Sequence, residues 1–121
     1  MAKYTITDKE SLRLALDEVK AQFMKAGLDG VCLFHSKLVF SELASNVVRH
    51  TEKGGEIQVE VRTERVEFTL TGEASMSMPQ TSQCSPATAE SGRGLFLIDS
   101  VCDSRENTDD GVKIVLIRKN G

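Results

Sequence analysis

Two alternating segments in the middle of the chain constrain its fold more than any other feature. Apolar and polar residues alternate over residues 56–62 and again over residues 66–70, a pattern typical of strands with one buried face. Thr63 and Glu64 between them form a tight turn, so we expect an antiparallel hairpin. Such a hairpin needs a second layer to cover its apolar face.

Helical patterns before the hairpin can supply that layer. Thr7 as N-cap and Glu10 at N3 resemble a capping box, and the helix they begin runs to about Lys25. A second helix begins within residues 29–31 and ends at residue 50 or 51. Its apolar stripe consists of Leu38, Val39, Leu43 and Val47.

The remaining segments complete a two-layer plan. Residues 4–6 form a short strand, residues 95–101 a short buried helix, and residues 103–108 and 112–118 a closing hairpin. This order predicts one α+β domain over residues 1–121. We expect a two-layer sandwich of helices on a mixed, mostly antiparallel sheet.

A polar stripe on the second predicted helix is the first candidate site. Glu42, Asn46 and His50 recur at i, i+4 and i+8, so their side chains stack on one helical face. Asn is unusual in a helix interior because its side chain competes for backbone hydrogen bonds. A carboxylate and an amide oxygen one turn apart can act as a general base and as a ligand of a hard cation. A solvated polar face is the alternative, and the stripe alone does not decide between the two.

A glycine-rich turn is the second candidate site. Residues 73–91 are rich in Ser, Thr, Met, Gln and Pro and have no period, as expected of a functional lid or of disorder. Gly92, Arg93 and Gly94 follow and open the predicted short helix. Backbone N–H groups there can bind an anion, and Arg93 could add a bidentate phosphate contact. A simple tight turn explains such a glycine pair more often when it stands alone.

The overall charge argues against several functions. The 121 residues carry a net charge of −3, and the pI is about 5.4, which argues against direct nucleic-acid binding and against an anionic membrane surface. We expect no signal peptide and no membrane span, since no apolar run reaches about 18 residues. The widely spaced Cys32, Cys84 and Cys102 fit no zinc or redox pattern and indicate reduced thiols in a cytoplasmic protein.

The combination of polar stripe, hairpin, lid and glycine turn resembles a known family. The chain resembles the GHKL (Bergerat) ATPases, which have the histidine-kinase-like ATPase fold. Within them it resembles the anti-sigma-factor serine kinases of bacterial partner-switching systems. Residues 41–50 match their N box, and residues 90–98 match the glycine box that cradles nucleotide phosphates. The resemblance covers nearly the whole chain, and the N box is the more specific motif.

The resemblance implies a role for each matching residue. Asn46 would bind the Mg²⁺ that bridges the phosphates of ATP, and Glu42 would act as general base on a substrate serine. Arg49 and His50 would lie near the phosphates or the base of the lid. The full set that the resemblance assigns to nucleotide binding is Asn46, Arg49, His50, Gly92, Arg93, Gly94 and Leu95.

The chain departs from the family at the adenine contact. After the second hairpin strand the family has an Asp-x-Gly motif, whose Asp accepts the adenine amino group. Here Gly72 stands at the Asp position and Ala74 at the Gly position. The loss of that acceptor should cost about 1–3 kcal/mol, or roughly 5- to 150-fold in affinity. Glu73 is the nearest carboxylate that could replace it.

The resemblance implies a function in transcription regulation. The chain would hold a sigma factor inactive and phosphorylate a serine of a STAS-domain anti-anti-sigma partner. It would form a homodimer through its first strand and first helix. Two alternatives remain at this point: a binding module of the same fold with weak or lost nucleotide binding, and a small α+β domain whose polar stripe is incidental.

Overall fold

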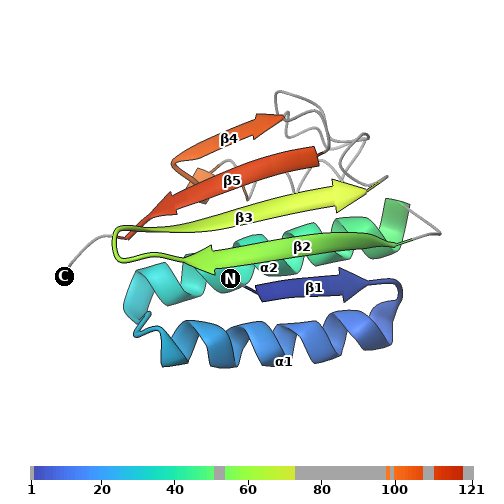
Figure 1. The fold of residues 1–121 in the computed structure, drawn as a ribbon, viewed down its shortest axis with the longest axis horizontal. Coiled ribbons are helices and arrows are strands. Elements are labelled where there is room, and N and C mark those ends of the chain that lie inside the picture. Colours follow the sequence, from blue (N-terminus) through green and yellow to red (C-terminus); the bar gives the residue numbers. More distant parts are fainter. Residues whose placement is uncertain (1, 51–53, 73–97, 99, 108–110, 119–121) are drawn as a thin grey trace.

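The computed structural model describes residues 2–50, 54–72, 98, 100–107 and 111–118. Within these residues the chain forms two long helices and five strands (Figure 1). In chain order they are β1 (Ala2–Ile6), α1 (Lys9–Lys25), α2 (Gly30–His50), β2 (Gly55–Val61), β3 (Arg65–Gly72), β4 (Ser104–Asn107) and β5 (Gly111–Ile117).

The five strands form one sheet in the order β1-β2-β3-β5-β4. Every pairing among these strands is antiparallel. The predicted hairpin is confirmed as β2 and β3, in a register that places Val59 opposite Phe68 and Glu60 opposite Glu67. The predicted closing hairpin is confirmed as β4 and β5. The α+β two-layer architecture is therefore confirmed, with an antiparallel sheet.

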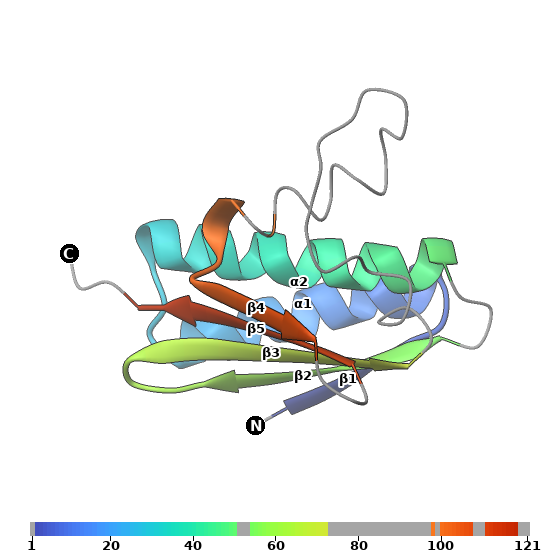
Figure 2. The same cartoon turned by 90° about the horizontal axis from the view of Figure 1, so that it is seen from above.

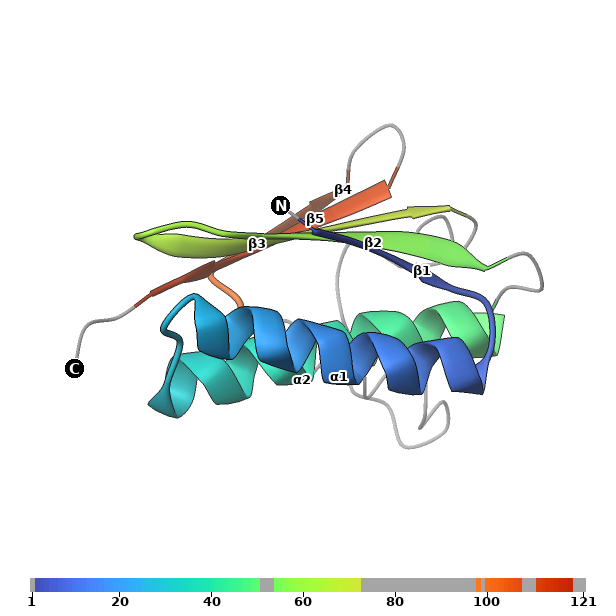
Figure 3. The same ribbon diagram turned by 60° about the horizontal axis from the view of Figure 1, so that its bottom comes forward.

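Both long helices lie on one face of the sheet, as Figures 2 and 3 show from two sides. Aromatic side chains pack between the layers. The ring centroids of Phe23 on α1 and Phe68 on β3 lie 6.2 Å apart. Those of Tyr4 on β1 and Phe40 on α2 lie 5.2 Å apart. The largest fully buried side chains include Ile6, Phe23, Phe40, Leu43, Ile57, Phe68, Leu70, Ile98 and Ile114.

The start of α1 differs from the prediction by one residue. Asp8, not Thr7, is the N-cap, and Ser11, not Glu10, completes the capping box. Oδ1 of Asp8 accepts a hydrogen bond of 2.8 Å from the Ser11 backbone N–H, and Ser11 Oγ accepts one of 3.0 Å from the Asp8 N–H. A carboxylate is also favoured by the positive end of the helix dipole. These hydrogen bonds lower the pKa of Asp8.

The hydropathy of the long helix α2 is high over most of its length. Residues 30–49 are long and apolar enough to span a membrane by length and composition, a test that core helices also pass. Val39, Phe40 and Leu43 of this helix are fully buried in the common core. We therefore interpret α2 as a core helix.

Several predicted segments lie outside the described residues. They are the lid at residues 73–91, the glycine box, and most of the short helix predicted at 95–101. Within that helix Ser100 and Val101 are helical, and the Cys102 N–H donates a hydrogen bond of 2.9 Å to the Ile98 carbonyl oxygen. These contacts agree with the predicted helix at its C-terminal end.

Candidate functional site

The C-terminal half of α2 presents the predicted polar stripe beside the core. Leu43 and Val47 are fully buried, and they fix the orientation of this part of the helix. Asn46 lies between them and is 4% exposed, so its amide is buried at the edge of the apolar layer. Glu42, one turn earlier, is half-buried. A buried Asn in a helix interior excludes the simple picture of a solvated polar face at this position.

Asn46 has one hydrogen-bond partner among the described residues. Nη2 of Arg49 donates a hydrogen bond of 3.1 Å to Asn46 Oδ1, a contact that i, i+3 neighbours on a helix can make. An amide oxygen has two lone pairs, so one acceptor position of Asn46 is left. The structure thus brings together Asn46 and Arg49, which the resemblance placed in the same site.

Glu42 has no such partner. Its carboxylate forms no hydrogen bond and no ion pair with the residues that the structure describes. A half-buried carboxylate next to a buried amide is suited to accept a proton or to bind a ligand from outside the chain. The role of Glu42 as general base stays a prediction.

The departure at Gly72 lies close to this part of α2. Gly72 ends β3 opposite Gly55 of β2. A Cβ built on Gly55 would lie 3.2 Å from Cγ2 of Val47, so the paired ends of β2 and β3 lie against the turn of α2 that carries Asn46. Alternation along β3 places position 72 on the same, helix-covered face as the buried Leu70.

The other predicted site residues lie outside the described part of the chain. These are Glu73, Gly92, Arg93, Gly94, Leu95 and the side chain of His50. Within the described residues, no group of three or more His, Cys, Asp or Glu side chains could hold a metal ion. A metal ion at Asn46 would therefore need ligands from a bound phosphate and from water, as Mg²⁺ commonly has.

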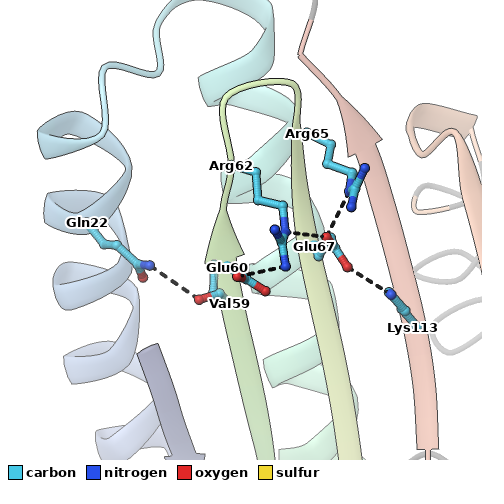
Figure 4. Close-up of polar contacts among 7 residues, drawn as sticks. All are labelled: Gln22, Val59, Glu60, Arg62, Arg65, Glu67 and Lys113. Carbon is cyan, nitrogen blue, oxygen red and sulfur yellow. Dashed lines mark hydrogen bonds and ion pairs between the residues drawn. The ribbon is translucent and has the colours of Figure 1, made fainter. Parts of the chain in front are cut away.

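A charged cluster on the outer face of the sheet was not predicted. Figure 4 shows the Glu67 carboxylate in contact with three cations. Its Oε2 lies 2.9 Å from Nε of Arg62 and 2.8 Å from Nε of Arg65, and its Oε1 lies 2.8 Å from Nζ of Lys113. Hydrogen bonds from Lys113 and Arg65 lower the pKa of Glu67 from 4.5 to about 2. Arg62 and Arg65 are thus engaged within the fold.

The sequence contained a signal for this cluster. A two-residue turn at Thr63 and Glu64 places Glu60 directly opposite Glu67, and two like charges in that position repel each other. Cations must therefore lie nearby. Arg62 bridges the pair, since its Nη2 lies 3.0 Å from Oε1 of Glu60.

Comparison with known families agrees with the fold. A family model described as the histidine kinase-like ATPase domain matches residues 6–119. The chain therefore belongs to the histidine kinase-like ATPase domain family, whose members bind nucleotides. No curated protein matches the sequence.

Proposed function

We propose that this chain is an ATP- and Mg²⁺-dependent serine-protein kinase that also acts as an anti-sigma factor in the bacterial cytoplasm. Its substrate would be a serine of a STAS-domain anti-anti-sigma protein, and its second partner a sigma factor. The chain would act as a homodimer. Family membership supports nucleotide binding. The match of residues 41–50 to the N box of anti-sigma kinases supports the assignment as an anti-sigma serine kinase.

One observation carries the proposal more than any other. Asn46 is buried, yet it makes only the hydrogen bond to Arg49 within the described residues, and Glu42 one turn away makes none. Buried polar groups in folded proteins are normally satisfied. A buried amide with a spare acceptor beside an unpaired carboxylate is expected where a ligand completes the hydrogen bonding.

The residue chemistry fits Mg²⁺ and ATP in this region. Oδ1 of Asn46 is a hard oxygen ligand, which Mg²⁺ prefers, and no described residue other than Arg49 donates a hydrogen bond to it. Bound Mg²⁺–ATP would supply the phosphoryl group and neutralise its charge. Glu42 would accept the proton of the substrate serine hydroxyl. Arg49, next to Asn46, would hold negative phosphate charge by charge-assisted hydrogen bonds.

The proposal is tested by replacing the general base. Glu42→Gln should abolish transfer of radiolabelled phosphate from ATP to a STAS-domain substrate, because an amide cannot accept the hydroxyl proton. ATP binding measured by calorimetry should remain, since Glu42 is not a predicted ligand. Glu64→Gln, which changes an exposed carboxylate in the turn between β2 and β3, is the matched control and should leave transfer intact. If the Glu42 variant still transferred phosphate, Glu42 would not be the general base.

Gly72 favours a second candidate function. Without the family's Asp at that position, adenine has no specific acceptor at the end of β3. The chain would then be a binding module with the same sigma-factor and STAS-domain partners but with weak or lost nucleotide binding. The two candidates differ in ATP affinity, which separates them directly.

A further inference from the structure

A pocket lies at the end of α2 that is remote from Asn46. In Figures 1 and 2 the first turn of α2, the segment just before β4 and the end of β5 meet at one end of the molecule. They enclose a pocket of about 470 Å³, which is within the usual range for ligand-binding pockets. Asn46 comes fourteen positions after Cys32, which lies in the pocket wall, so the two are about 21 Å apart along the helix axis.

The wall of this pocket is part apolar and part polar, and its apolar part continues onto an exposed surface. The apolar lining residues include Val31, Cys32, Val101 and Leu116. Val31 is 69% exposed, and Phe34, three residues later on the same helix, is 64% exposed. Cys32 and Leu33 pack against the core near the start of α2, and Val39 and Leu43 are buried further along the helix. Val31 and Phe34 are not among these core residues. The exposed pair is therefore not needed for packing the two layers, as is typical of residues that bind a partner.

Two carboxylates give the same pocket a negative charge. Asp29 and Asp103 both line it, and both are exposed. Neither forms an ion pair with a described residue, although Oδ2 of Asp103 accepts a hydrogen bond of 2.6 Å from the Ile117 N–H. No Lys or Arg is among the described lining residues, and His35 is their single basic side chain. The charge on this pocket is therefore uncompensated by the described residues around it.

We propose that this pocket docks a segment of a partner protein in which an apolar side chain stands next to a Lys or Arg residue. The apolar side chain would fill the pocket against Val31 and Val101. The basic residue would face Asp29 and Asp103, which supply the complementary charge. The same carboxylates repel phosphate groups, so a nucleic acid or an anionic membrane does not fit. This inference uses no residue of the nucleotide site and holds whether or not the chain binds ATP.

Two capped hexapeptides that differ in charge test this inference. Both contain two central leucines; one has flanking lysines and the other has flanking glutamates. We expect the lysine peptide to shift the amide NMR resonances of Val31, Cys32 and Val101 in the isotope-labelled full chain. The glutamate peptide should bind at least about tenfold more weakly, because the pocket carboxylates repel it.

Three variants connect the binding to the pocket. Asp29→Asn removes charge but keeps a residue that can cap α2, and it should weaken the lysine peptide about threefold. Val31→Asn should weaken it about fivefold through lost apolar contact. Asp17→Asn, on the exposed face of α1, is the matched control and should have no effect. Equal binding of both peptides, shifts unaffected by the Asp29 and Val31 variants, or no shifts at about millimolar peptide would each overturn the proposal.

Discussion

The outer face of the sheet and the C-terminal half of α2 each bury a polar side chain, but they satisfy it differently. On the sheet, the Glu67 carboxylate contacts Arg62, Arg65 and Lys113 at distances of 2.8–2.9 Å. On α2, Asn46 accepts one hydrogen bond of 3.1 Å from Arg49. Both residues are at most 9% exposed. The two side chains differ in how many hydrogen bonds their oxygens can still accept from a ligand once the described residues have made theirs.

This comparison separates a structural polar group from a candidate binding group. A carboxylate saturated by three cations has little left to offer a ligand, and its charge is held by the fold. Among the described residues, Asn46 keeps one lone pair without a donor and the Glu42 carboxylate has no partner, so both can gain hydrogen bonds or a cation from a ligand. The expectation is therefore that changes at Glu67 affect stability, whereas changes around Asn46 affect binding.

The largest expected effect is on stability, at Glu67. The shift of its pKa from 4.5 to about 2 corresponds to about 3 kcal/mol. Solvent screening of the half-exposed cations reduces this value, so Glu67→Gln should lower the free energy of unfolding by about 2 kcal/mol in urea denaturation. Glu60→Gln, at the more exposed carboxylate opposite, should cost less than about 1 kcal/mol. Equal losses of unfolding free energy in the two variants would contradict the conclusion that Glu67 is the carboxylate that holds the cluster together.

The pH dependence of stability tests whether the charge of Glu67 stabilises the cluster. Because the pKa of Glu67 is lowered in the folded state, its contribution is present above the unfolded pKa of 4.5 and is lost as pH falls towards about 2. The difference in unfolding free energy between the wild type and Glu67→Gln should therefore shrink steadily over that range. A difference that stays constant from neutral pH to about pH 2 would mean that the carboxylate charge is not what stabilises the cluster.

The next effect is on nucleotide affinity, at the end of β3. Gly72→Asp restores the acceptor that the family places there, on the face of β3 that the helices cover. It should tighten ATP binding by about tenfold, or about 1.4 kcal/mol, as measured by calorimetry. Gly72→Ala is the control, because it adds a side chain without a hydrogen-bond acceptor, and it should leave the ATP affinity unchanged. Unchanged affinity in the Asp variant would mean that the adenine contact is built elsewhere.

Sequence reasoning predicted the parts of this molecule that depend on local pattern. Alternation over residues 56–62 and 66–70 was enough to predict the hairpin β2–β3, and its short turn fixed the register of Glu60 and Glu67. The N-cap was wrong by one residue, because Thr7 and Asp8 are both good caps and the Asp8–Ser11 hydrogen bonds decide between them.

Features made by distant segments could not be predicted in the same way. The pocket joins the first turn of α2, residues 100–103 and the end of β5, and no periodicity relates these segments. The three cations at Glu67 come from both strands of a hairpin and from β5, so Lys113 could be placed only once the pairing of β3 with β5 was known. The polar stripe of Glu42, Asn46 and His50 was predicted because helical spacing alone brings these residues onto one face.

Calorimetric titration of the full chain with ATP, with and without Mg²⁺, tests the central claim about α2 most directly. If Asn46 is a metal-binding amide and not a structural one, ATP should bind with a Mg²⁺-dependent heat and an affinity of about micromolar or weaker. Asn46→Ala should remove the dependence on Mg²⁺. No detectable binding up to about millimolar ATP, with or without Mg²⁺, would contradict the claim and leave the chain as a partner-binding module.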